Sequence, residues 1–405
     1  MFILIFSILW IYMGFGSRVL GVLIMQSVLL YLVSHTRRQI LVWIVVLLAI
    51  ASFTVDIIIE LQDHYIGSTY NGTICIAAST LRLLCFGLEF CSNTKPEKPA
   101  TGYNFFDLLL FNFYLPVFPY GPLIGYDTFL AQINSEVKLL SWKEVKTISK
   151  ELLRCCFWAV VTDTLLHFLY FGGMTKHQET RLSLTARDLS FVALYHLFLF
   201  QLSTFVLYSL SCVLASFDRI TAPQPPICIL SMHFFKDMWR YFDRGLNAML
   251  TKYIYFPLGG SKHGLLRQSL AALACFLFVA FWHGGGQIYF TWALLNWIGV
   301  QLEAVALTFA DQFGPLHKLQ EKLSPPMLRR FYALCAVPNY LFLASSNLVF
   351  VIGPEKTRFF IQSIIFNDWP WNILCVFGAF YCCMQVVNEV ERRVGKKVLL
   401  SKDYL

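Results

Sequence analysis

LAALACFLFVAFWHGGGQIYFTWALLNWIGVQLEAVALTF occupies residues 270–309 and settles the class of structure. It contains no Lys or Arg and one acidic residue, Glu303. Three glycines after His283 divide it into two apolar runs, Leu270–Phe281 and Tyr289–Phe309. A helix needs about 20 apolar residues to cross the hydrocarbon of a bilayer, so runs of this kind predict membrane-spanning helices.

The rest of the chain has the same character. Of its 405 residues 57% are hydrophobic and 14% are charged, whereas soluble domains are about 25% charged. Backbone polar groups inside a bilayer must be bonded internally, which favours helices throughout. The sequence therefore predicts an all-α, polytopic membrane protein with about ten transmembrane helices plus interfacial or re-entrant pieces.

One segment differs from these spans. Between Glu136 and Arg154 apolar residues recur at helical spacing with lysines between them, which predicts an interfacial helix lying on the membrane. The other expected spans are Met1–Phe15, Val19–Ser34, Ile40–Ile59, Ile74–Cys91, Cys155–Gly172, Leu189–Phe217, Phe331–Ile352 and Trp371–Val387.

Charge and cysteine content exclude several functions. The net charge is +8, but the basic residues lie in short loops, a pattern typical of cytosolic loops next to anionic lipid and not of a nucleic-acid-binding surface. Arg37 and Arg38 therefore mark a cytosolic loop. The twelve cysteines lack paired CxxC spacing, so disulfides and zinc are not expected.

His283 is the sharpest candidate for chemistry. Ionisable groups at membrane depth are costly, so each is a functional candidate. An imidazole at the break between two apolar runs can act as a general base or acid near neutral pH. The alternative from this residue alone is a structural histidine bonded to a neighbouring helix.

Asp243 is the second candidate, within MWRYFDRGL at residues 238–246. Its carboxylate can orient a histidine or a substrate amine, and the alternative is a salt bridge to Arg240 or Arg244. A third candidate is the turn at Tyr255–Ser261, whose backbone N–H groups can hold an anion.

Further polar residues are expected inside spans. Asp163 and His167 lie four residues apart, which favours a pair that satisfies itself on one helix face. His196, Arg82 and Glu89 are expected in packing or cavity roles.

Residues 103–390 resemble a membrane-bound O-acyltransferase, most closely its Hedgehog acyltransferase branch. The resemblance is carried by MWRYFDRGLNAMLTKYIYFPLGGSKHGLL at 238–266, FVAFWHGGGQIYFTWALLNWIGVQLE at 278–303, SSNLVF at 345–350, DWPW at 368–371 and the Phe113–Pro122 stretch. This resemblance implies helices around a central tunnel.

The resemblance also implies roles for individual residues. His283 matches the essential histidine, and Asp243 matches its catalytic partner. Trp239, Arg240 and Asn347 match positions at the acyl-CoA site and near the reaction centre. Relatives bind haem through a cysteine after a Pro-Pro pair, the place that Cys228 occupies.

The implied activity is transfer of palmitoyl from palmitoyl-CoA to the N-terminal cysteine of a secreted Hedgehog-type signalling protein, with formation of an amide. The implied location is the endoplasmic reticulum membrane, or the Golgi. The expected organisation is N-terminal transmembrane helices at 1–102, shortened relative to the family, an acyltransferase core at 103–390 and a basic cytosolic tail at 391–405.

Two alternatives stay open. The first keeps acyl transfer and changes the acceptor to a lipid, a sterol or a serine of a Wnt-type protein. The second is a non-catalytic membrane scaffold or a transporter, although transporters often show repeated halves and this chain does not.

Overall fold

The computed structural model describes residues 2–54, 70–93, 102–136, 139–262, 264–312, 314, 321–367 and 369–394. Across these residues the chain forms helices and no strand, which confirms the all-α prediction. Seven helices among them are long and apolar enough to cross a membrane. Two shorter apolar segments, Gln39–Ala51 and Phe105–Val117, accompany them.

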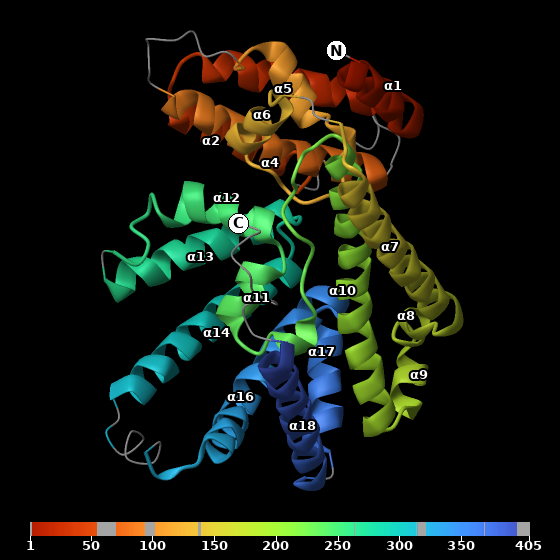
Figure 1. Ribbon diagram of the computed structural model, residues 1–405. Coiled ribbons are helices and arrows are strands. Elements are labelled where there is room, and N and C mark those ends of the chain that lie inside the picture. Colours follow the sequence, from red (N-terminus) through yellow and green to blue (C-terminus); the bar gives the residue numbers. More distant parts are fainter. Residues whose placement is uncertain are drawn as a thin grey trace.

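The N-terminal helices form one layer at the top of the molecule (Figure 1). Its members are α1 (Phe2–Ser34), α2 (Gln39–Ala51), α4 (Tyr70–Ser92), α5 (Phe105–Asn112), the short η1 (Leu115–Val117) and α6 (Tyr126–Ile133). Helix α4 contacts α1, α2, α5 and α6 and is the most enclosed span of the chain's described part. Its side chains Cys85 and Phe86 are fully buried, so α4 is the centre of this layer.

The separation of the first two expected runs, Met1–Phe15 and Val19–Ser34, is confirmed for the described residues, because α1 is kinked at Gly16, where the backbone is non-helical with a φ of 87°. One other expected boundary was wrong. The expected interfacial helix and the expected span after it form one helix, α7 (Trp142–Phe168). Neither Gly nor Pro interrupts α7, and Ser141 and Glu144 cap its start reciprocally. The seven apolar spans count α1 once and do not include α7, so they are fewer than the expected number.

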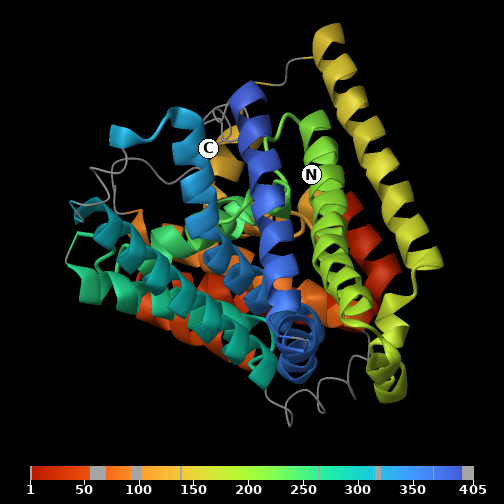
Figure 2. The ribbon, with the colours of Figure 1, turned by 90° about the horizontal axis from the view of Figure 1, so that it is seen from below.

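Helix α7 lies along α10 (Ala186–Phe217), and the two are joined through the short helices α8 (Phe171–Met174) and α9 (Gln178–Ser183). Seen from below, α7 lies at the rim of the molecule, with α10 between it and the other helices (Figure 2).

The remaining long helices complete the lower part of the molecule (Figure 1). Helix α13 (Leu265–Trp282) packs on α14 (Gln287–Gln312), α14 on α16 (Pro325–Ile352), and α16 on α18 (Trp371–Val394). Helix α16 also contacts α10 and leads into α17 (Pro354–Ile361) and the π-helical η4 (Gln362–Phe366).

A broken segment lies among these long helices. It consists of η2 (Ile229–Ser231), α11 (Phe235–Tyr241), α12 (Arg244–Leu250) and the π-helical η3 (Thr251–Tyr255). Short helices and irregular backbone are tolerated at membrane depth where protein surrounds them. This segment carries Trp239, Arg240 and Asp243.

Candidate functional site

His283 ends α13 in a turn that only glycine can complete easily. Gly284 and Gly285 have φ values of 122° and 64°, in the region that residues with a Cβ avoid. The Gly285 N–H donates to the Ala280 carbonyl at 3.0 Å, and the Gly284 N–H donates to the Phe281 carbonyl at 3.1 Å. This bonding pattern is the Schellman motif that terminates many helices. The glycines thus stop α13 with the imidazole at its end.

Aromatic rings surround the imidazole. The Tyr289 ring stacks on it with centroids 5.6 Å apart and planes 23° apart. The Phe350 and Trp292 rings meet it edge-on, at 5.1 and 6.2 Å. His283 is half-buried, and burial lowers its pKa from 6.5 to about 4. The ring is therefore neutral at neutral pH, with a lone pair available to accept a proton.

Trp292 brings three of the predicted residues together. Its ring, on the buried face of α14, lies 5.2 Å from that of Trp239 and contacts His283. Its indole N–H donates to Asn347 Oδ1 at 3.4 Å. Sequence reasoning missed Trp292, because a tryptophan inside a span carries no local sign of such contacts.

Glu303 fixes the start of α11. This carboxylate on α14 is 7% exposed, and it accepts hydrogen bonds from the backbone N–H groups of Phe235 at 2.7 Å and Lys236 at 3.3 Å. Asn339 of α16 donates to the same carboxylate at 3.1 Å. The Phe235 ring lies where a Cβ on Gly299 would be, so α11 is packed tightly on α14. The sequence analysis assigned Glu303 no role.

Asp243 fixes the start of α12. Its Oδ1 accepts from the Leu246 N–H at 2.9 Å, as an N-cap, and its Oδ2 accepts from the Tyr208 hydroxyl at 2.6 Å. Burial raises the pKa of Asp243, and these two hydrogen bonds oppose that rise. In the described part of the chain no ion pair joins Asp243 to Arg240 or Arg244, so that alternative is not observed.

Glu89 fixes the end of the same segment. This buried carboxylate of α4 accepts from Lys252 Nζ at 2.7 Å, from the Tyr253 hydroxyl and from the Asp127 N–H at 2.7 Å. Three carboxylates, Glu303, Asp243 and Glu89, therefore hold residues 235–255 at the start, the middle and the end.

Asp243 and His283 are related through intervening rings. Phe242 stacks on Phe200 at 5.5 Å, Phe200 meets Phe350 at 5.4 Å, and Phe350 meets His283 at 5.1 Å. Within the described residues there is no hydrogen bond between the two candidates. Arg240 is exposed at the end of α11.

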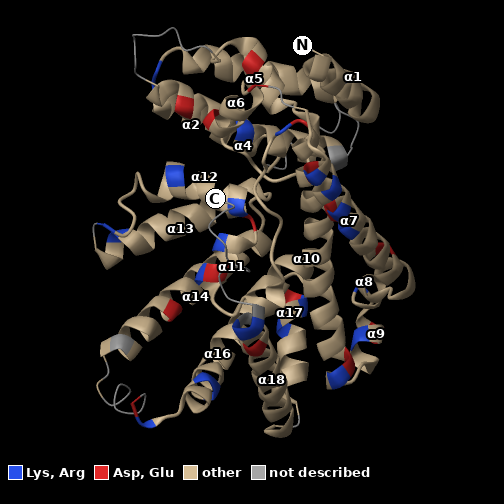
Figure 3. Ribbon diagram, in the orientation of Figure 1, with Lys and Arg blue, Asp and Glu red and all other residues tan. Residues whose placement is uncertain are grey.

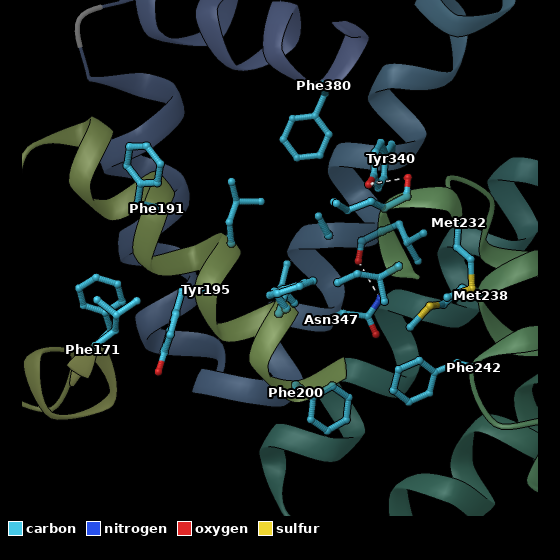
Figure 4. A pocket seen from close by; sticks show the side chains of 18 residues that line it. Phe171, Phe191, Tyr195, Phe200, Met232, Met238, Phe242, Tyr340, Asn347 and Phe380 are labelled. Carbon is cyan, nitrogen blue, oxygen red and sulfur yellow. Dashed lines mark hydrogen bonds between the residues drawn. The ribbon is translucent and has the colours of Figure 1, made fainter. Parts of the chain in front are cut away.

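An apolar cavity of about 560 Å³ adjoins this group between α10, α11, α16 and α18 (Figure 4). Phe200 and Phe242 line it at one end, and Asn347 is one of its few polar groups. Tyr340 and Phe380 lie toward the opposite end in Figure 4. Its volume and apolar lining suit an apolar ligand whose polar end lies near Asn347.

The other sequence predictions have mixed outcomes. Asp163 and His167 are both exposed on α7, and among the described residues no hydrogen bond or ion pair joins them, so the self-satisfied pair was wrong. Arg82 donates to the carbonyls of Phe111 and Val117, which confirms a packing role. His196 is bonded to a carbonyl of its own helix, that of Val192.

Cys228 lies exposed at the start of η2, with Tyr340 and Cys383 nearby. The apolar cavity begins beside it, at Ile229 and Leu230. A thiolate next to an apolar space is chemically compatible with haem iron. In the chain as described, no group of three or more His, Cys, Asp or Glu residues could hold a metal ion.

Comparison with known proteins adds the following. A family model described as "MBOAT, membrane-bound O-acyltransferase family" matches residues 6–347. The chain is 29% identical to the protein-cysteine N-palmitoyltransferase HHAT of Mus musculus over 93% of its length and 79% of the relative's. It is 29% identical to the HHAT-like protein of the same species, over 96% of this chain and 77% of that relative. It is 28% identical to the protein-cysteine N-palmitoyltransferase Rasp of Drosophila melanogaster, over 74% of this chain and 60% of that relative.

Proposed function

Because this chain belongs to the membrane-bound O-acyltransferase family, we propose that it transfers palmitoyl from palmitoyl-CoA to the N-terminal cysteine of a secreted Hedgehog-type protein. It is a multi-pass membrane protein and an acyltransferase. The acceptor, the acyl group and a location in the endoplasmic reticulum or Golgi belong to the proposal. So does the division into segments 1–102, 103–390 and 391–405, although residues 395–405 lie outside the described part of the chain.

The observation that carries the proposal is the His283 imidazole, which the glycine turn holds at the end of α13 and whose pKa burial lowers. Its ring neighbours Trp292 and Phe350 contact Asn347 and Phe200, which line the apolar cavity. Acyl transfer from a thioester to an amine needs a base, because a protonated amine is not nucleophilic. Such a base needs a lone pair at neutral pH and a fixed position. His283 has both.

The proposed reaction proceeds as follows. The amine nitrogen attacks the thioester carbonyl carbon and forms the C–N bond, His283 accepts the amine proton, and the C–S bond breaks. The proton on His283 then passes to the departing CoA thiolate. The negative charge of Asp243 favours the positive charge that develops during attack. The Nδ2 of Asn347 donates one N–H to the Leu343 carbonyl at 2.8 Å and keeps a second for the substrate oxygen.

Binding of the donor uses the cavity and its rim. The acyl chain lies in the apolar cavity, with the thioester toward Asn347. Trp239 and Arg240 lie on α11, and we assign them to binding of the CoA part of the donor. The acceptor enters from the opposite face of the membrane and meets the donor at His283, so the site brings the two substrates together.

Transfer of labelled palmitoyl in detergent tests the proposal. Labelled palmitoyl-CoA is expected to label a peptide that begins with cysteine, and the same peptide with an acetylated N-terminus is expected to stay unlabelled. Label that appears only in lipid would replace the protein acceptor by a lipid or sterol. Absence of any transfer would favour the non-catalytic scaffold.

The pH dependence of this assay has an expected sign. Burial lowers the pKa of His283 to about 4, so the imidazole stays neutral and able to accept a proton from pH 5 upward. The α-amino group of the acceptor has a pKa of about 7.7–8.0. We therefore expect kcat/KM to rise with pH as the amine loses its proton, without an inflection near 6.5. An inflection near 6.5 would place His283 in a more hydrated setting than the structure shows.

Trp292→Phe tests the contact with Asn347. The change keeps the ring against His283 and removes the N–H that binds Asn347 Oδ1. A hydrogen bond of this kind contributes about 1 kcal/mol, so kcat/KM is expected to fall several-fold. Trp297→Phe is the matched control, because Trp297 is also on α14 but its indole donates to the Ser269 carbonyl of α13 and not to Asn347. An equal loss in both variants would point to packing of α14 alone.

Haem ligation by Cys228 stays a prediction. A haem held there would occupy apolar space beside η2, and acyl transfer as described uses none of its chemistry. The Soret absorbance of the purified protein, compared with that of Cys228→Ala, decides whether this thiolate binds iron.

A further inference from the structure

One side of α7 carries a row of cations. Lys143, Lys146, Lys150 and Arg154 recur every three or four residues, so they lie on one side of the helix, and all four are exposed. We call this row the basic stripe. Figure 3 shows the Lys and Arg residues along the first half of α7.

The lysines of the basic stripe are available to bind a partner from outside the chain. Glu144 pairs with Arg219 beyond the end of α10, and Glu151 pairs with Arg154. Among the described residues Lys143, Lys146 and Lys150 have no ion-pair partner. Three unpaired ammonium groups on one side of a helix favour an anionic partner.

The same side of α7 becomes apolar further along the helix. Phe157 follows Lys146 by eleven residues and Phe168 follows by another eleven, and eleven residues make about three helical turns. Phe157 is 61% exposed and Phe168 75% exposed. A side that is basic for three turns and apolar thereafter matches the change from lipid head groups to hydrocarbon.

Contacts with α10 give the basic stripe its depth in the membrane. Glu144 meets Arg219, the Cys155 thiol donates to the Val206 carbonyl at 3.5 Å, and the Tyr195 hydroxyl donates to the Leu165 carbonyl at 3.1 Å. The two helices therefore run antiparallel. The basic stripe lies beside the last turns of α10, a membrane-spanning helix, which is the level of the membrane surface.

We infer that the basic stripe binds the phosphate groups of anionic phospholipids in the adjoining leaflet. Exposed hydrocarbon-facing rings lie directly below the cations, and a lipid offers both a phosphate and a chain to such a surface. Lysine side chains reach toward a head group while their stems cover apolar surface. The stripe is on α7, which lies at the outer rim (Figure 2), whereas the aromatic neighbours of His283 pack in or against the main hydrophobic core.

The partner helix connects this surface with the catalytic group. Helix α10 supplies Tyr208, which bonds Asp243, and Phe200, which contacts Phe350. Lipid binding that holds α7 on α10 thus stabilises one wall of the site.

Spin-label spectroscopy of the full chain in phosphatidylcholine bilayers tests the inference. Trace spin-labelled phosphatidylserine is expected to associate about three- to fivefold more strongly than spin-labelled phosphatidylcholine, since a Lys near the surface contributes about that factor. Raising the salt concentration from about 0.01 M to 1 M shortens the screening length from about 30 Å to 3 Å and is expected to abolish the preference. A wild-type chain without preference would overturn the inference.

Matched variants locate the binding. The triple change K143Q, K146Q and K150Q is expected to reduce the preference to about one, and K143R, K146R and K150R to keep it. Removing three exposed cations in the first turns of α16 and just before it, with K322Q, R329Q and R330Q, is expected to leave most of the preference. An unchanged preference in the α7 Gln variant would overturn the inference. If the α7 Gln variant kept its lipid preference and showed a raised KM for the acyl-CoA, the inference would also be overturned, because the basic stripe would then bind the acyl-CoA donor.

Discussion

His283→Ala is expected to lower the rate of acyl transfer by about 10²–10⁴-fold, the range that a positioned general base contributes. The variant removes the only group in the aromatic enclosure formed by Tyr289, Trp292 and Phe350 that the mechanism assigns to accept the amine proton. The turn itself is expected to survive, because the backbone bonds of Gly284 and Gly285 define it.

The measurement is single-turnover transfer of labelled palmitoyl at saturating donor, with thermal unfolding in detergent as a check of the fold. His167→Ala is the matched control, since that histidine is exposed on α7 and belongs to no part of the site. If His283→Ala keeps a rate within a few-fold of wild type while remaining folded, general-base catalysis by His283 is wrong.

Asp243→Asn is expected to lower the transfer rate by about 10²-fold and to leave the fold intact. The amide keeps an oxygen to accept from the Leu246 N–H, so the cap of α12 persists. It loses the negative charge that favours positive charge during attack, and such stabilisation is strong where water is excluded. Transfer assays and thermal unfolding on the same preparation measure the two effects separately.

Two companion variants separate charge from structure at this position. Asp243→Ala loses the cap, worth about 1 kcal/mol, and leaves the buried Tyr208 hydroxyl without its acceptor, at a cost of about 1–3 kcal/mol. It should therefore be less stable as well as inactive. Tyr208→Phe keeps the carboxylate and should keep most of the activity. Wild-type activity in Asp243→Asn would make Asp243 a structural cap alone.

The sequence predicted the features that depend on neighbours along the chain. Long apolar runs predicted an all-α membrane protein, and the break at Gly284–Gly286 placed His283 at the end of a span. Both features depend on neighbouring residues, because the length of an apolar run determines a spanning helix and consecutive glycines determine a helix-terminating turn.

Features set by distant partners were not predictable in this way. Glu303 caps a helix 67 residues away, and Glu89 binds Lys252 and Tyr253 across 163 and 164 residues. Spacing suggested a bond between Asp163 and His167, yet both side chains point outward on an exposed helix. Spacing on a helix shows which residues share a side, but the side's environment depends on tertiary packing.

Because Glu89 of α4 accepts hydrogen bonds from Lys252 and Tyr253, the N-terminal helices help to position the segment that carries Asp243. A polypeptide deprived of α4 would keep His283 and Asp243 yet lose the acceptor that fixes the far end of residues 235–255. Inherited substitutions in α4 are accordingly expected to lower the catalytic rate, although they lie almost two hundred residues before His283.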